Sequence, residues 1–304
     1  MTRPAVPLGT ALARGPLVLD GGLSNQLEAQ GCDLADELWT ARLLRDDPAS
    51  VRAAHAAYVR AGARVLITGS YQASFEGFAR AGARRREAAG LFRRSVSLAR
   101  EAAGDRTVWV AASVGPYGAV RADGGEYRGR YGLSMRELAA FHRPRMEALA
   151  EAEPDVLALE TVPDTDEAEA LLRAASGCGL PVWLSYTIAG DRTRAGQPLA
   201  DAFALAGGAG QVVAAGVNCC APGDAGHAVR VAAEVTGKPV VVYPNSGEEW
   251  GGGHGRGWHG TASWSADLAA GWLEQGARLV GGCCRVGPEL IAGLAREVSL
   301  REAP

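Results

Sequence analysis

Two adjacent cysteine pairs are the residues of this chain best suited to chemistry. Cys219 and Cys220 close the stretch "GVNCC", and Cys283 and Cys284 close "GGCC", so four of the six cysteines stand in pairs. Clustered cysteines in a chain whose thiols stay reduced point to metal or thiol chemistry. Three thiolates drawn from the two pairs would suit one soft, borderline ion, above all zinc, and would leave its fourth tetrahedral position open for a substrate.

Packing and oxidation are the alternatives to a metal site. A free cysteine is often a small buried hydrophobe, and we interpret the lone Cys32 and Cys178 in this way. Burial as small hydrophobes explains two cysteine pairs at matching strand ends less well. A disulfide between adjacent cysteines is possible, but we rank it below a metal site. His254 and His259 offer no tight pairing with nearby cysteines, so we interpret them as surface residues of a loop.

Eight short apolar runs are the elements that must position these residues. Each is apolar on both parities, the pattern of a strand buried on both faces of a parallel sheet. In chain order the runs are "LVLDGG" (17–22), "RVLITGS" (64–70), "VWVAASVG" (108–115), "VLALETV" (156–162), "PVWLSYT" (181–187), "AAGVNCC" (214–220), "PVVVYPN" (239–245) and "ARLVGGCC" (277–284).

Helical patterns separate these runs, most clearly over 47–62, 134–154, 164–177, 265–276 and 287–300. Ser134 and Glu137 predict a capping box at the start of the second pattern, and Pro144 predicts a kink or a break within it. Strand then helix, eight times, predicts an α/β fold in which residues 1–304 form a single (β/α)8 TIM barrel domain. A doubly wound sheet is the alternative, but "DGGLSNQ" lacks its phosphate-binding glycine pattern.

The active site of such a barrel lies where the strands end. The predicted strand ends are rich in polar side chains: Asp20, Thr68, Ser70, Ser113, Glu160, Ser185, Asn218, Tyr243 and Asn245, with Tyr71 and Gln72 just after the second strand. The cysteine pairs end the sixth and eighth strands, so we expect them at the same rim. Gly281 and Gly282 lack a Cβ atom, and we expect the backbone to bend there so that Cys283 and Cys284 both face one ion.

The composition argues against several classes of partner. Hydrophobic residues make up 47%, charged residues 21%, and the net charge is −3. The cations are spread along the chain, so neither nucleic acid nor an anionic membrane is favoured. No signal-peptide pattern and no apolar run of membrane-spanning length is present, and we expect a cytoplasmic protein with reduced thiols.

Several motifs together resemble the homocysteine S-methyltransferase family. They are "GVNC" (216–219), "GGCC" (281–284), "LDGGLSNQLEAQG" (19–31), "LWTARLL" (38–44), "ITGSYQASFEGF" (67–78), "SVGPYG" (113–118), "LETVPD" (159–164) and "YPNSGE" (243–248). The resemblance covers essentially the whole chain. It implies a homocysteine-binding (β/α)8 barrel over 1–304 and a zinc ion held by Cys219, Cys283 and Cys284.

The same resemblance implies the roles of further residues. Asp20 and Glu160 match the carboxylates that bind homocysteine, and Asn245 matches a candidate fourth metal ligand in the absence of substrate. Cys220 is an additional cysteine that we expect to point away from Cys219. The expected substrate-binding set is completed by Ser70, Tyr71, Gln72, Asn218 and Asn245.

The resemblance is closest to the short single-domain members, which methylate homocysteine from S-methylmethionine or S-adenosylmethionine. The stretch "SYQASFEGF", and the end of the chain about 20 residues after "GGCC", favour this group over betaine-dependent relatives. The sulfonium donor is expected to meet aromatic faces, with Trp39, Tyr71 and Trp258 as candidates. The glycine-rich stretch 245–260 is expected to form a mobile loop over the barrel mouth.

Three alternatives stay open from the sequence. The metal site could serve another thiol or another methyl donor, or the chain could be a zinc-binding or thiol-redox protein without methyl transfer. A Schiff-base or phosphate-ester barrel enzyme is disfavoured, because Lys238, the lysine of the chain, precedes the seventh strand and falls at the opposite rim. We expect a monomer or a small homo-oligomer.

Overall fold

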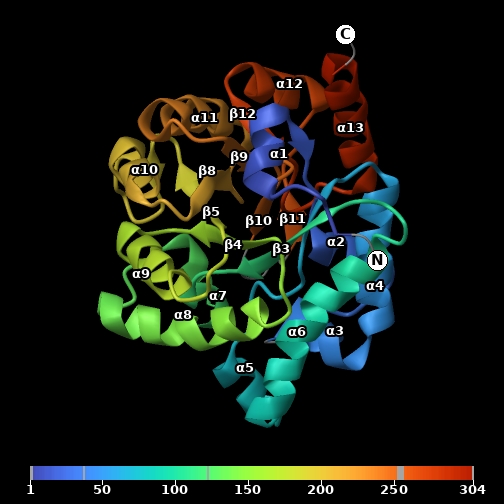
Figure 1. Ribbon diagram of the computed structural model, residues 1–304, viewed down its shortest axis with the longest axis vertical. Helices are drawn as coiled ribbons and strands as arrows, with labels where there is room; N and C mark the ends of the chain where they lie inside the picture. Colours follow the sequence, from blue (N-terminus) through green and yellow to red (C-terminus); the bar gives the residue numbers. More distant parts are fainter. Residues whose placement is uncertain (1–2, 37, 122, 252–256, 303–304) are drawn as a thin grey trace.

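Eight parallel strands close into a barrel surrounded by helices (Figure 1). The computed structural model describes residues 3–36, 38–121, 123–251 and 257–302. The barrel strands are β1 (Leu17–Val18), β2 (Val65–Ile67), β3 (Trp109–Val114), β4 (Val156–Val162), β5 (Val182–Tyr186), β8 (Val212–Asn218), β9 (Val240–Tyr243) and β12 (Ala277–Val280). Neighbours pair in the order β1-β12-β9-β8-β5-β4-β3-β2, and a bridge between Leu19 and Val65 closes β1 onto β2.

The helices form the outer layer. Their bounds are α1 (Leu8–Arg14), α2 (Leu23–Ala29), α3 (Thr40–Asp46), α4 (Pro48–Arg60), α5 (Phe75–Arg80), α6 (Arg85–Ala102), α7 (Tyr117–Arg121), the 3-10 turn η1 (Gly125–Tyr127), α8 (Met135–Ala150), α9 (Thr165–Ala175), α10 (Leu199–Gly208), α11 (Pro222–Thr236), α12 (Ala266–Glu274) and α13 (Pro288–Glu302). Among the described residues, no helix is both long enough and apolar enough to cross a membrane.

The predicted TIM barrel is confirmed, and each of the eight apolar runs overlaps one barrel strand. The capping box at Ser134 and Glu137 is also present. Of the kink or break expected at Pro144, the break is wrong, because α8 continues through this residue to Ala150. Pro144 removes one backbone donor from the helix, and the packing of α8 against α9 and α6 holds the remaining turns.

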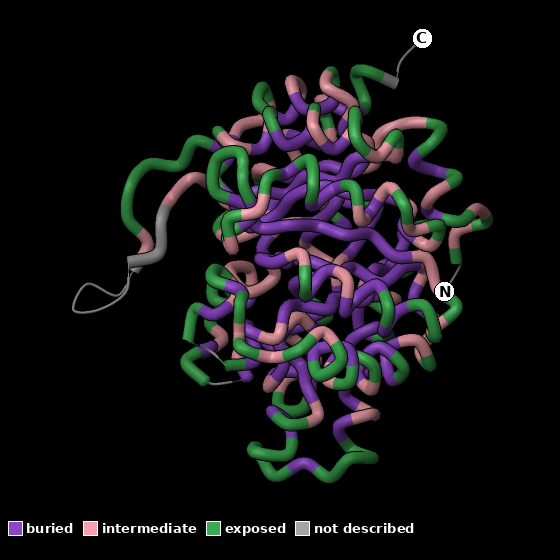
Figure 2. Tube along the Cα trace, turned by 90° about the vertical axis from the view of Figure 1, so that its left-hand side faces the viewer, coloured by how far each residue is buried: buried purple, intermediate pink, exposed green. Residues whose placement is uncertain are grey.

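Two apolar layers stabilise the barrel. A large cluster lies between the strands and the helices, and a smaller one fills the barrel interior with side chains such as Trp109, Trp183 and Leu279. Figure 2 shows this arrangement as buried strands inside a shell of partly exposed helices and loops. The short helix α1, which precedes the first strand, adds the fully buried Leu8 and Leu12 to the interior cluster.

Two short hairpins interrupt the strand–helix alternation. β6 (Ile188–Ala189) pairs with β7 (Arg192–Thr193), and β10 (Glu249–Gly251) pairs with β11 (Gly257–His259), both antiparallel. The expected loop over 245–260 therefore contains a β-hairpin, although residues 252–256, including His254, lie outside the described part. His259 is exposed, as expected for a surface residue.

Candidate metal centre and active site

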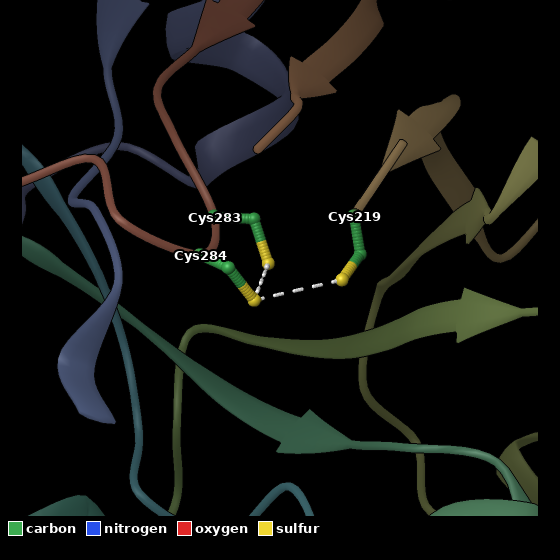
Figure 3. A group of neighbouring side chains, drawn as sticks. All are labelled: Cys219, Cys283 and Cys284. Carbon is green, nitrogen blue, oxygen red and sulfur yellow. Dashed lines mark hydrogen bonds between the residues drawn. The ribbon is translucent and has the colours of Figure 1, made fainter. Parts of the chain in front are cut away.

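Three cysteine thiols converge at the C-terminal rim of the barrel (Figure 3). The sulfur of Cys219 lies 3.9 Å from that of Cys284, which lies 4.0 Å from the sulfur of Cys283. All three sulfurs fall within 4.8 Å of one another, and they are the one such group of possible metal-binding side chains in the described residues. Cys219 follows β8, and the other two follow β12, so residues far apart in sequence meet here.

The backbone of Cys219 explains which thiol of the first pair takes part. Cys219 comes directly after the last residue of β8 and has φ of 49°, in the left-handed region. Its N–H donates to the carbonyl of Tyr243 at 3.2 Å, which holds this turn against the end of β9. The next side chain, Cys220, is fully buried in the apolar cluster between strands and helices. Cys220 is therefore turned away from the three-sulfur group, as expected.

Close packing explains the two glycines of "GGCC". A Cβ on Gly281 would lie 2.6 Å from the carbonyl oxygen of Asp20, and a Cβ on Gly282 would lie 2.1 Å from the Val286 side chain. Neither glycine has a positive φ, and the left-handed residue at this strand end is Arg285, with φ of 62°. The two glycines allow the backbone of Asp20 and the side chain of Val286 to approach closely, and the left-handed turn at Arg285 comes just after the cysteines.

The donor set and its electrostatics fit zinc. Hydrogen bonds from the thiols of Cys283 and Cys284 hold the pKa of Cys219 well below its usual range, so the group readily carries a thiolate. The Asn245 side chain also contributes a hydrogen bond to Cys219, and its Oδ1 accepts the Cys284 N–H at 3.1 Å. Three sulfur ligands with an open side are a catalytic zinc arrangement. Asn245 is seen holding the cysteine loops, and its role as a fourth ligand stays a prediction.

A pocket opens beside the three sulfurs. The cysteines form one wall, and the other lining side chains include Trp39, Tyr71, Glu126, Tyr127, Glu160 and Tyr243. The sequence-predicted candidates Trp39, Tyr71 and Glu160 are thus brought together with the cysteines. Trp258 lies instead against Arg285, whose guanidinium carbon is 5.9 Å from the centre of the indole ring.

Glu160 is a buried carboxylate held in a fixed direction. The hydroxyl of Ser113 donates to its Oε1, and the hydroxyl of Tyr243 donates to its Oε2 at 3.0 Å. Burial raises the pKa of Glu160 to about 7, although both hydrogen bonds act in the opposite sense. A desolvated carboxylate in this position would accept an ammonium group strongly.

Asp20 lies deeper, next to the pocket wall formed by Gly21 and Gly22. Its Oδ2 accepts the N–H of Ile67 at 2.9 Å, whereas its Oδ1 is buried without a hydrogen-bond partner in the described residues. Burial raises the pKa of Asp20 well above its usual range, and the charge of Glu160 adds to the shift. The two carboxylates therefore act on one another, and a cation between them would relieve both.

Three other candidates support the site from behind the pocket wall. The Ser70 hydroxyl donates to the Ser113 carbonyl at 2.8 Å, and the Gln72 amide donates to the Ala119 carbonyl at 3.1 Å. The Asn218 side chain accepts the Thr161 N–H at 2.7 Å and donates to the Thr161 hydroxyl at 2.7 Å. None of these three side chains lines the described pocket.

Residues with left-handed backbone conformation are concentrated around the pocket. Six non-glycine residues of the described chain have positive φ, and four of them line the pocket or adjoin its cysteines, namely Trp39, Thr161, Cys219 and Arg285. Each such residue costs of order 1 kcal/mol or more and persists only where surrounding contacts impose it. The double hydrogen bond from Asn218 supplies that constraint at Thr161.

Glu126 and Tyr127 are pocket residues that sequence reasoning missed. They lie in η1, between α7 and α8, and the Tyr127 hydroxyl is 3.1 Å from the Cys219 sulfur. The neighbouring Cys219 sulfur raises the pKa of Tyr127, which keeps the phenol protonated as a donor. The segment follows no strand directly and has no helical or strand periodicity, so no pattern pointed to it; its one local signal is an acidic and an aromatic residue after two glycines.

Comparison with known proteins agrees with this site. The family model described as Homocysteine S-methyltransferase matches residues 17–298. The chain is 44% identical over 293 residues to the homocysteine S-methyltransferase of Escherichia coli K12, covering 91% of this chain and 94% of that protein. It is 43% identical over 316 residues to homocysteine S-methyltransferase 4 of Zea mays, covering 96% and 91%. The crystal structure of the metallated E. coli homocysteine methyltransferase MmuM has a TM-score of 0.85 at 42% identity, covering 96% of this chain and 99% of that one.

Proposed function

Because this chain belongs to the homocysteine S-methyltransferase family, we propose that it moves a methyl group from a sulfonium donor, S-methylmethionine or S-adenosylmethionine, to the sulfur of homocysteine, forming methionine. The observation that carries this proposal is the group of three sulfurs that opens onto a pocket containing Glu160. Soft sulfur ligands beside a buried carboxylate suit a substrate with a thiol at one end and an ammonium at the other.

The metal site has a defined part in this reaction. Cys219, Cys283 and Cys284 would hold the zinc ion, and the pocket side stays open for the homocysteine sulfur. When bound, zinc supplies Lewis-acid activation that lowers the pKa of a substrate thiol. Asn245 ties the two cysteine loops together through its bonds to Cys284 and Cys219.

The carboxylates would bind and orient the amino acid end of homocysteine. Glu160 presents one face to the pocket while Ser113 and Tyr243 fix its two oxygens. The unpartnered Oδ1 of Asp20 provides a second negative charge behind it. An ammonium held by Glu160, with Asp20 in support, places the substrate thiol toward the cysteines, which line the same pocket.

The methyl transfer itself needs alignment rather than a general base. The homocysteine sulfur forms a bond to the methyl carbon, the bond from that carbon to the donor sulfur breaks, and its electron pair stays on the donor sulfur. The sulfonium becomes a neutral thioether, and no proton moves at carbon. Trp39 and Tyr71 line the pocket and present aromatic surface to the cationic donor.

The setting of the chemistry is also part of the proposal. Metal binding through three cysteines requires reduced thiols, which supports a cytoplasmic location. We treat residues 1–304 as one homocysteine-binding domain, acting as a monomer or a small homo-oligomer. A thiol-redox role is the second candidate, because sulfur–sulfur distances of 3.9 and 4.0 Å are short enough for two of the thiols to form a disulfide, with loss of two protons and transfer of two electrons to an added oxidant.

Methionine formation is the test of the proposed function. Zinc-loaded protein is incubated with homocysteine and, in parallel, S-methylmethionine, S-adenosylmethionine or betaine. Methionine from a sulfonium donor, with none from betaine, is the expected result and identifies the donor. No turnover with any donor in zinc-replete protein would overturn the proposal, and reversible thiol oxidation without turnover would favour the redox role.

A further inference from the structure

Glu126 is a second pocket carboxylate that the proposed roles leave unused. It lines the same pocket as Glu160 and the three cysteines. Its Oε2 is buried and has no hydrogen-bond partner in the described residues. A buried carboxylate oxygen without a partner is costly, so such a group in a substrate pocket points to a ligand that supplies the missing contact.

The segment that carries Glu126 is built to hold it in place. A Cβ on Gly118 would lie 2.3 Å from the backbone of Gly125, so α7 and η1 pack with no space between them. Within the segment, the Gly125 N–H donates to Asp123 at 2.9 Å, and the Tyr127 N–H donates to the Gly124 carbonyl at 3.1 Å. Glu126 is therefore fixed over the pocket by its backbone.

Among the described residues, no ion pair joins a cation to Glu126. Burial raises the pKa of this carboxyl group, although the charge of Arg128 acts to lower it. The guanidinium of Arg128 lies 3.4 Å from the carboxylate of Asp123 and is largely exposed. The guanidinium carbon of Arg194 lies 5.5 Å from the centre of the Tyr127 ring, on that aromatic face. Glu126 therefore lines the pocket together with the aromatic side chains of Trp39 and Tyr71, and its buried Oε2 has no hydrogen-bond partner among the described residues.

The position of Glu126 relative to the metal centre suits one substrate. The adjacent Tyr127 hydroxyl is 3.1 Å from the Cys219 sulfur, so η1 borders the place where the homocysteine sulfur must lie. In an in-line transfer, the donor sulfur approaches within a methyl group of that sulfur. The charge of the donor is centred on its sulfur, and that charge must therefore come to rest beside η1.

We propose that Glu126 is the residue that recognises the positive charge of the sulfonium methyl donor, with Glu160 left to the ammonium of homocysteine. This inference rests on the proposed function and deepens it. The charge of the donor disappears as the methyl group leaves, so the carboxylate interacts more strongly with the bound donor than with the transition state. Glu126 consequently sets donor affinity and selects a charged sulfur over a neutral one.

The test compares wild type and Glu126→Gln, which removes the charge and keeps the shape. With S-methylmethionine we expect the donor KM to rise about tenfold to a hundredfold, the range for loss of a contact to a charged group. The kcat should stay the same or increase, and the KM for homocysteine should stay the same. A fall in kcat with an unchanged donor KM would overturn the inference.

Binding measured by calorimetry in zinc-loaded protein gives a readout that does not need turnover. S-Methylmethionine should bind more weakly to Glu126→Gln than to wild type, whereas methionine, the same molecule without the charged methyl, should bind equally to both. Equal loss for both ligands would show a merely structural role. If wild type forms no methionine from any donor, the proposed function fails, while the calorimetric comparison still decides the role of Glu126.

Asp123→Asn is the matched control. Asp123 lies in the same segment and carries the same charge, but it is exposed and does not line the pocket. Its asparagine variant keeps an oxygen that can accept the Gly125 N–H. We expect unchanged donor affinity in Asp123→Asn, and a loss as large as in Glu126→Gln would assign the effect to the net charge of the segment and overturn the inference.

Discussion

At the scale of single residues, one backbone angle separates two neighbouring thiols. An extended strand would direct Cys219 and Cys220 to opposite faces, which the sequence predicts. The structure adds a left-handed φ at Cys219, which turns this residue out of the strand at the rim, while Cys220 stays in the core. The three thiols that converge could therefore be predicted from motif and alternation, and the turn that directs Cys219 toward the other two could not.

Replacing single cysteines tests whether Cys283 belongs to the metal site and Cys220 to the core. We expect Cys283→Ala to lose most of its zinc and its activity, because two remaining sulfur ligands leave the ion half coordinated. Cys220→Ala should keep about one zinc per chain and near-normal activity, with a modest loss of stability from the vacated core volume. Elemental analysis of freshly purified protein, together with the methionine assay, measures both. Full zinc content in Cys283→Ala would remove this residue from the site.

Glu160 gives a prediction for pH dependence. Burial raises its pKa in the folded protein from 4.5 to about 7. A carboxyl group with a raised folded pKa stabilises the fold below its unfolded pKa, and that contribution is lost as the pH rises through the folded value. From pH 5 to pH 8, wild type should therefore lose up to about 3 kcal/mol of unfolding free energy relative to Glu160→Gln.

Urea unfolding of both proteins at several pH values measures this difference. Subtracting the variant from wild type removes the contributions of distant titrating groups, and what remains belongs to Glu160 together with Asp20 and Cys219, whose charges act on it. Addition of homocysteine at pH 7 should reduce the difference, because an ammonium favours the ionised carboxylate. A wild-type protein that gains stability relative to Glu160→Gln as the pH rises would contradict the buried, desolvated state of this side chain.

At the scale of elements, the structure shows why some of the site escaped sequence reasoning. The strands were recognisable because a parallel barrel strand is apolar on both faces, and the rim residues followed from strand order. The η1 segment with Glu126 and Tyr127 has no such periodicity and reaches the pocket through tertiary packing of Gly118 on Gly125. Ser70 and Asn218 were named by position at strand ends, which does not reveal whether a side chain faces the pocket or the wall.

Helix α8 supports the pocket through a buried polar network. Nη1 of Arg145 donates to the Ala73 carbonyl at 3.3 Å, and Nη2 donates to the Gly115 carbonyl and to Nδ1 of His142. Nε2 of His142 is 3.0 Å from the carboxylate of Glu167 on α9. Burial holds the pKa of His142 well below its usual range, so the ring is neutral and donates from Nε2 to that carboxylate. The network joins two helices to the loops that flank Tyr71.

Arg145→Met tests the weight of this network. The variant leaves two carbonyls and His142 without a donor in a buried site, and we expect a loss of about 3 kcal/mol or more in unfolding free energy. Arg143→Met is the matched control, since Arg143 lies on the same helix but is exposed, and it should change stability by about 0.5 kcal/mol or less. Chemical denaturation measures both, and equal stability of the two variants would show that the network contributes little.

At the scale of the whole molecule, the two ends of the barrel have different tasks. The sulfurs and the substrate pocket lie at the C-terminal ends of the strands. Near the start of the chain, Leu8 and Leu12 of α1 extend the interior cluster, and the indole of Trp109, at the first residue of β3, donates to the Val6 carbonyl at 3.0 Å. Helix α1 thus fills the opposite end of the barrel. The strand–helix alternation, which begins at residue 17, did not predict this helix, because a seven-residue stretch is too short to show a helical period of apolar residues.

This separation predicts that stability and catalysis can be changed independently. Leu12→Ala removes a fully buried side chain from the barrel interior, and we expect a loss of about 2–5 kcal/mol in unfolding free energy. Leu300→Ala is the matched control. It deletes the same side-chain atoms, but Leu300 is 72% exposed, so these atoms contact mainly solvent. At temperatures where Leu12→Ala remains folded, its KM for homocysteine and for the methyl donor should equal the wild-type values. A changed KM in a folded Leu12→Ala protein would show that the packing of α1 reaches the chemical rim, and the two ends of the barrel would then have to be treated as one coupled unit.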